Sequence, residues 1–198
     1  MKFCILMGSP RKNGNTMSLL EPFTETIKAA GHEADIVRLY DKKIEPCLAC
    51  RRCQEDFTKF GCVQNDDMQE IFDDVLGADV VIWATPIYSW HCPAPMKAVL
   101  DRLVYGMNKY YGEEKGPALW AGKNHALLIT CGYPPEKGAD LFEQGMIRYF
   151  KHSRLMYLGS LKVHDEGYKF DFMTEEKACA ARAFARTILN NYSTSRIQ

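Results

Sequence analysis

Residues 3–16 read Phe-Cys-Ile-Leu-Met-Gly-Ser-Pro-Arg-Lys-Asn-Gly-Asn-Thr, and this stretch decides the fold. The apolar run at 3–7 is typical of a strand that is buried on both faces. A loop with two glycines follows at 8–16, and apolar residues then recur at helical spacing between 19 and 27. A buried strand that leads through a glycine loop into a helix predicts the first unit of a parallel α/β sheet.

The same alternation continues along the chain. We expect further strands at 34–39, 80–84, 126–130 and 155–163, and further helices at 68–76, 93–103, 139–149 and 175–190. Asp66 or Asp67 is expected to cap the helix at 68–76. The pattern predicts one domain over residues 1–198. Its fold is a flavodoxin-like three-layer α/β sandwich, in which a five-stranded parallel sheet of order 2-1-3-4-5 carries helices on both faces.

Composition excludes several function classes. The chain has 25 Lys and Arg residues against 25 Asp and Glu residues, so its formal net charge of zero does not suggest a nucleic-acid or membrane-surface binder. No apolar run is long enough to span a bilayer, and the N-terminal apolar run is too short for a signal peptide. We therefore expect a cytoplasmic protein, in which eight cysteines serve as thiols or metal ligands rather than as disulfides.

The loop at 8–16 has the composition of an anion site. Its glycines allow close approach of a ligand, the following helix offers free N–H groups, and Arg11 adds a forked cation. Side-chain donors come from Ser9, Asn13, Asn15 and Thr16. The loop matches neither Gly-x-x-x-x-Gly-Lys-Ser/Thr nor Gly-x-Gly-x-x-Gly, which excludes a P-loop and disfavours a dinucleotide fingerprint. An ordinary capped turn is the alternative.

A second loop, at 85–97, reads Thr-Pro-Ile-Tyr-Ser-Trp-His-Cys-Pro-Ala-Pro-Met-Lys. Its aromatic side chains can stack on a planar ring, although aromatics in such a loop can also simply cap the core. His91 could serve a substrate there or be purely structural. Ligands of doubly wound sheets bind beyond the carboxyl ends of the strands, so we expect the loops after the first, third and fourth strands to meet.

Residues 8–16, 85–88 and 96–102 together resemble the NADPH-dependent FMN reductase branch of flavodoxin-like proteins, and the resemblance extends over nearly the whole chain. It implies an oxidoreductase that passes electrons from NAD(P)H, or from a reduced carrier, through FMN to a small-molecule or protein acceptor. A flavodoxin-like electron-transfer protein without a small-molecule substrate is the alternative. Because the flavin carries the chemistry, no catalytic acid or base is assigned.

The resemblance also assigns site residues. The FMN phosphate would be held by Ser9, Arg11, Asn13, Asn15 and Thr16. The flavin ring would lie against Pro86, Ile87, Tyr88, Ser89 and Trp90. The loop after the fourth strand would close its other side with Thr130, Gly132 and Tyr133.

Four cysteines gather in the segment 46–66 as Cys47-x2-Cys50-x2-Cys53-x8-Cys62. The first three have the spacing of [4Fe–4S] ligands, and four thiolates would also satisfy zinc. The chain is similar here to iron–sulfur flavoproteins, although the x8 gap exceeds that of their compact motif. A cluster would couple a one-electron carrier such as ferredoxin to a two-electron acceptor. Without one, the thiols would pack like small apolar groups or form a reversible redox pair.

The segment 105–122 is rich in Tyr and Trp and lacks a helical stripe, as lids and interface segments do. The resemblance implies that it reaches a neighbouring subunit in a homodimer or homotetramer. Trp120 is expected to anchor the segment in the core. Asp101 and Arg102, just before it, are expected to pair or to cap on their helix.

Overall fold

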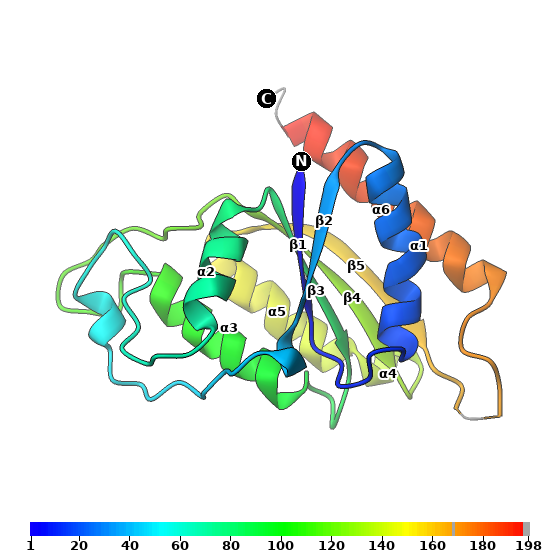
Figure 1. The fold of residues 1–198 in the computed structure, drawn as a ribbon, viewed down its shortest axis with the longest axis horizontal. Coiled ribbons are helices and arrows are strands. Elements are labelled where there is room, and N and C mark those ends of the chain that lie inside the picture. The colour runs from blue at the N-terminus through cyan, green and yellow to red at the C-terminus, as the bar shows by residue number, and fades with distance from the viewer. Residues whose placement is uncertain (168, 196–198) are drawn as a thin grey trace.

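A five-stranded parallel sheet forms the centre of the computed structural model, which describes residues 1–167 and 169–195 (Figure 1). The strands are β1 (Lys2–Met7), β2 (Glu33–Arg38), β3 (Val80–Pro86), β4 (Asn124–Cys131) and β5 (Met156–His164). Their order is β2-β1-β3-β4-β5, and every neighbouring pair is parallel. The predicted fold and strand order are confirmed.

Helices cover both faces of the sheet (Figure 1). One layer is formed by α1 (Asn15–Ala29) and α6 (Glu175–Ser195), and the other by α2 (Met68–Gly77), α3 (Ala94–Met107) and α5 (Asp140–His152). The short helix α4 (Pro135–Gly138) precedes α5, and two 3₁₀ turns, η1 (Leu39–Asp41) and η2 (Arg52–Gln54), lie between β2 and α2. No helix in the described part of the chain is long and apolar enough to cross a membrane.

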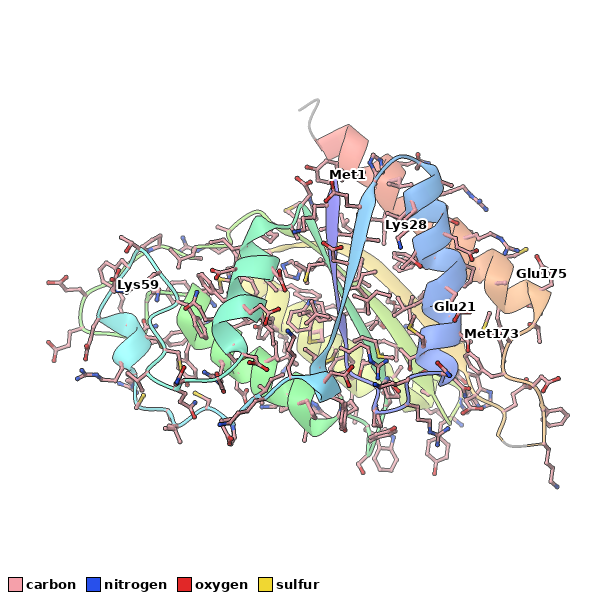
Figure 2. All side chains as sticks on the ribbon, viewed as in Figure 1. Met1, Glu21, Lys28, Lys59, Met173 and Glu175 are labelled. Atoms are coloured by element: carbon pink, nitrogen blue, oxygen red, sulfur yellow. The ribbon has the colours of Figure 1, made fainter. Side chains whose placement is uncertain are left out.

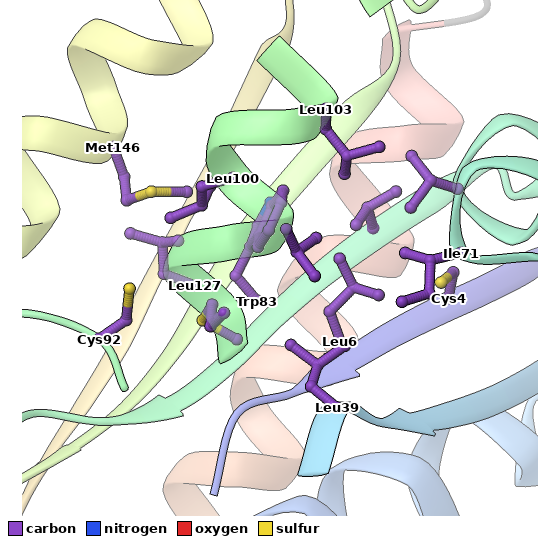
Figure 3. Packing of buried hydrophobic residues seen from close by; sticks show 14 of the residues in the cluster. Cys4, Leu6, Leu39, Ile71, Trp83, Cys92, Leu100, Leu103, Leu127 and Met146 are labelled. Atoms are coloured by element: carbon purple, nitrogen blue, oxygen red, sulfur yellow. The ribbon is translucent and has the colours of Figure 1, made fainter. Parts of the chain in front are cut away.

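The alternation of side chains along the strands produces two cores. On β1, Phe3 and Ile5 pack toward α1 and α6, whereas Cys4 and Leu6 face the layer of α2, α3 and α5. Figure 3 shows the second core, in which Trp83 and other strand side chains meet Leu100 and Leu103 of α3. A sheet buried on both faces explains why its inner strands are continuous apolar runs in the sequence.

Some predicted boundaries were wrong. Leu39 belongs to η1 rather than to the second strand, and the helix expected at 139–149 is α5, which continues three residues further to His152. The helix α3 continues to Met107, three residues into the segment 105–122, because Leu103 and Met107 extend its buried stripe. Beyond α3, an antiparallel bridge joins Asn108 to Ala118, so the two ends of the segment lie together.

Candidate functional site

The loops after β1, β3 and β4 meet at the carboxyl edge of the sheet, where they enclose a cavity of about 190 Å³. It is lined by Ser9, Arg11, Asn15, Thr16, Pro86, Ile87, Tyr88, Thr130, Cys131, Gly132 and Asp165. Nine of these residues were predicted from the sequence. The first loop lies close against α3 at Gly8, where a Cβ atom would come within 2.9 Å of Met96 Cε. A larger residue at position 8 would require the Met96 side chain to move.

The amino end of α1 opens toward this loop. Gly14 occupies the N-cap position, and no side chain among the described residues caps the helix; its first turn also carries no acidic residue. The first N–H groups of a helix have no partner within it and carry the positive end of its dipole. Two hydroxyl groups stand beside them, since Thr16 Oγ1 lies 2.8 Å from Thr130 Oγ1. These donors suit a phosphate group.

Asp165, from the loop after β5, was not predicted. Its side chain accepts a hydrogen bond from Asn15 Nδ2 at 2.7 Å and another from the Gly167 amide at 3.1 Å. The Asp165 amide in turn donates to the Cys131 carbonyl at 2.8 Å. Its position after the fifth strand was the available signal, because all parallel strands end at the same edge. The carboxylate orients Asn15 and offers an acceptor for hydroxyl groups.

A two-residue hairpin shapes the second loop. Tyr88 and His91 exchange backbone hydrogen bonds of 2.8 and 3.0 Å, while Ser89 and Trp90 adopt left-handed φ angles of 49° and 61°. Both central residues of a type I′ turn need positive φ, which normally selects glycine or asparagine. Residues with side chains are strained there, and such strain is commonly found at ligand sites.

Trp90 joins this hairpin to the loop after β4. Its Nε1 donates to the Lys137 carbonyl at 3.0 Å. Its ring is stacked on that of Tyr133, with 6.1 Å between the ring centroids and an interplanar angle of 5°. The pair borders a second cavity of about 330 Å³, which adjoins the first. Both cavities are lined by Ile87, Cys131 and Gly132. A Cβ atom on Gly132 would meet nothing within 4 Å, so a flat group can reach its backbone.

Two candidate residues lie apart from these cavities. Asn13 is exposed and lines neither of them. His91 borders a groove between α3 and α5, where its ring meets Phe142 edge-on and its Nδ1 lies 3.4 Å from Cys92 Sγ. Partial burial, together with nearby Lys97, lowers the pKa of His91. The other predicted ring and phosphate residues line one cavity or the other.

The four clustered cysteines line a separate cavity beside α3. The segment that carries them forms one end of the molecule: Lys59, within it, and Glu175 of α6 lie at opposite ends (Figure 2). Across residues 1–167 and 169–195, no three Cys, His, Asp or Glu side chains stand close enough together to hold a single metal ion. Four cysteine thiolates are the donor set both of tetrahedral zinc and of a [4Fe–4S] cluster, and all four thiols line this one cavity.

Arg102 lies against this cavity and corrects one expectation. Its NH1 binds Asp66, and its NH2 donates to Cys62 Sγ at 3.1 Å. Asp101 pairs with Lys97, one turn earlier on α3, as expected, whereas Arg102 pairs with a carboxylate outside its helix. Asp66 also receives the Met68 amide at 3.3 Å. Burial acts to raise the pKa of Asp66, but the hydrogen bonds from Arg102 and two backbone amides outweigh it and lower that pKa.

The amino end of α2 also differs from the side-chain cap expected there. Asp67 occupies the N-cap position, yet its carboxylate accepts the Lys43 amide at 2.7 Å and does not cap the helix. The Asp66 carboxylate instead accepts a hydrogen bond from the amide of Met68, the first residue of the helix. The two aspartates thus fix the path of the chain on either side of the cysteine-rich segment.

The chain is similar to flavoproteins along most of its length. The model of the NADPH-dependent FMN reductase family matches residues 1–163. An iron-sulfur flavoprotein of Methanosarcina thermophila is 37% identical over 125 residues, which cover 62% of this chain and 63% of that protein. One from Archaeoglobus fulgidus is 38% identical over 107 residues, which cover 54% and 47%. The chain thus spans between about half and two-thirds of the length of these relatives.

Solved structures share the fold at low identity. RosB with a bound 8-demethyl-8-formylriboflavin-5'-phosphate intermediate has a TM-score of 0.74 at 18% identity, covering 100% of this chain and 81% of RosB. An NAD(P)H:quinone oxidoreductase from Methanothermobacter marburgensis has a TM-score of 0.71 at 21% identity, covering 95% and 96%. With a family model that matches residues 1–163 and this shared fold, the chain belongs to the NADPH-dependent FMN reductase family.

Proposed function

We propose that this protein is an FMN-dependent oxidoreductase that passes electrons from NAD(P)H, or from a reduced carrier, to a small-molecule or protein acceptor. The observation that carries the proposal is the uncapped amino end of α1 at a cavity that continues into an aromatic-walled space. A phosphate fits the first part and a flat ring the second. Bound FMN would accept a hydride as an electron pair and release electrons to the acceptor.

The chain's own residues would bind and orient the flavin. The first-turn amides of α1, with Ser9 and Thr16, would hold the phosphate, and Arg11 lines the same cavity. Asn15 and Asp165 would receive the ribityl hydroxyl groups. The hairpin at 88–91 would lie along the ring edge, and Tyr133 would cover the open side together with Trp90.

The test is FMN titration of flavin-free protein, followed by anaerobic addition of NADH or NADPH. Thr16→Val removes a hydroxyl at the phosphate end, and a hydrogen bond to a charged group contributes about 1.5–3 kcal/mol. We therefore expect FMN binding about ten- to a hundred-fold weaker. Thr24→Val is the matched control, because Thr24 lies on the same helix and, among the described residues, its hydroxyl donates to the Glu21 carbonyl alone, at 3.0 Å.

The outcomes separate the alternatives. Failure of the wild-type protein to bind FMN would refute the proposal. FMN that binds but is reduced by neither nucleotide would identify an electron carrier without an NAD(P)H activity. Equal affinities of the Thr16→Val and Thr24→Val proteins would remove Thr16 from the phosphate site.

A second function is favoured by the cysteine cavity. We infer that Cys47, Cys50, Cys53 and Cys62 hold a [4Fe–4S] cluster that exchanges single electrons with a ferredoxin-type protein. All four line one cavity, all eight cysteines in the described chain are free, and relatives are named iron-sulfur flavoproteins. Free thiols fit the reducing cytoplasm. Iron and sulfide analysis of protein purified without oxygen tests the inference, and sedimentation tests the expected homodimer or homotetramer.

A further inference from the structure

Arg102 is one of two buried cations beside the cysteine cavity. Its side chain and that of Asp66 are each only 1% exposed. The guanidinium is held by Asp66, by the Glu45 carbonyl at 3.2 Å and by Cys62 Sγ at 3.1 Å. Its Nε has no hydrogen-bond partner among the described residues. One carboxylate therefore balances Arg102, and its remaining donor face lies against a thiol.

Lys109 is the second cation, and it is fully buried. Its Nζ donates to the Cys53 carbonyl at 2.6 Å and to the Phe60 carbonyl at 3.2 Å. Within the described ranges, no carboxylate forms a salt bridge with it. Two carbonyl groups solvate an ammonium group but do not neutralise it. Burial of such a charge is costly unless an opposite charge is near.

The local charges do not balance within the folded chain. Arg102 and Lys109 bring two buried positive charges to the inner side of the segment 46–66. Asp66 is the carboxylate bonded to Arg102, whereas Asp56 acts on Lys109 only through space and is itself paired with Lys59. Arg102 lines the pocket of the four thiols, and Lys109 lies behind the Cys53 and Phe60 carbonyls, whose residues also line it. Thiolates that ligate a metal cluster are anionic, and a cluster gains one more negative charge when it accepts an electron. The protein therefore supplies the counter-charge that this occupant requires.

We propose that Arg102 and Lys109 are positioning residues that raise the reduction potential of the cysteine-ligated cluster. This inference rests on the proposed cluster. When bound, the cluster would take up one electron from an external reductant, and the fixed cations would stabilise its more negative state. The N–H···S bond from Arg102 to Cys62 acts in the same direction, because hydrogen bonds to sulfur are among the groups that set such potentials.

The experiment is an anaerobic redox titration with dithionite, followed by electron paramagnetic resonance, on flavin-loaded protein reconstituted with iron and sulfide. Arg102→Gln and Lys109→Met should each shift the midpoint potential downward, and Arg102→Lys should shift it less. Asp66→Asn keeps Arg102 but removes the opposing carboxylate, so it should shift the potential upward. Arg52→Gln is the matched control, because Arg52 lies beside Cys53 but is 61% exposed and pairs with Glu55.

The midpoint potential is expected to fall in Arg102→Gln and Lys109→Met and to rise in Asp66→Asn, and these opposite shifts make the test decisive. A merely structural role would loosen the cluster in every variant and would not raise the potential of Asp66→Asn. If Arg102→Gln fails to fold, Lys109→Met and Asp66→Asn still carry the comparison. Midpoints equal to that of Arg52→Gln, with iron content unchanged, would overturn this inference and leave the cluster intact. A wild-type protein that binds no iron would overturn the cluster and this inference together, while FMN reduction by NAD(P)H would stand separately.

Discussion

His125 makes the stability of this protein sensitive to acid. The side chain lies on β4 with no exposed surface, among the rings of Trp83, Trp120 and Phe150. Its Nδ1 accepts the Trp83 Nε1 hydrogen at 2.9 Å, which places its own proton on Nε2. That nitrogen has no hydrogen-bond partner in the described chain. The pocket thus accommodates a neutral imidazole and offers nothing to a charged one.

The magnitude follows from the pKa. Burial, and to a lesser extent the charge of Lys123, lowers the pKa of His125 from 6.5 to about 3. Because the unfolded chain takes up this proton near pH 6.5 and the folded chain only near pH 3, the contribution is complete above pH 6.5 and is lost as the pH falls toward 3. At about 1.4 kcal/mol per unit, the full contribution is about 5 kcal/mol.

The assay is urea unfolding of the wild type and of His125→Gln at intervals from pH 7.5 to pH 3.5. Glutamine can still accept the Trp83 hydrogen but takes up no proton, so its curve should fall less steeply with acid. The carboxylates titrate in both proteins and cancel in the difference. Two parallel curves between pH 6.5 and pH 4 would show that His125 is protonated in the folded state and would refute the reasoning.

Three further substitutions test the packing and the backbone around the sites. Gly106→Ala would place a Cβ atom 2.2 Å from the Phe60 ring, so we expect the free energy of unfolding in urea to fall by about 1–3 kcal/mol. Gly145→Ala on α5 is the control: its Cβ atom would meet nothing within 4 Å, so this free energy should rise by about 0.5–1 kcal/mol. Equal effects would contradict the close packing of Phe60 on α3. Ser89→Gly should stabilise by about 1 kcal/mol by relieving the left-handed φ of 49°, and an unchanged midpoint in thermal unfolding would argue against strain in the hairpin with Trp90.

The sequence predicts the fold well because its signals are local. The apolar run at 80–84 and the glycine loop at 8–16 each report the structure of their own neighbourhood, and alternation alone restricts the topology to a few arrangements. The meeting of three loops at one edge then follows from parallel strands. For the same reason, most of the residues expected at the flavin site line the two cavities.

The choice of side-chain partners could not be predicted in this way. Asn15 binds Asp165, which lies 150 positions away, and Arg102 binds Asp66, which lies outside its helix. Charges on one helix face suggest local pairs, but Arg102 points inward from α3 and is buried, where only a carboxylate from another segment can reach it. Periodicity shows that a position faces the core but not which distant group it meets there.

The two candidate sites differ in what fixes their shape. The flavin edge is built on the ends of four strands whose side chains belong to two packed cores. The cysteine-rich segment buries Phe60, but its course also depends on polar groups. Gln54 Nε2, within the segment, donates to the Tyr105 and Asn108 carbonyls at 2.6 and 3.1 Å. Lys109, outside it, donates to the Cys53 and Phe60 carbonyls. Each hydrogen bond contributes only about 1 kcal/mol net. An anionic occupant that balances the buried cations would therefore change the stability of this segment far more than bound FMN would change the stability of the sheet edge. Protection of the segment's backbone amides from hydrogen exchange should accordingly rise with the iron content of the protein.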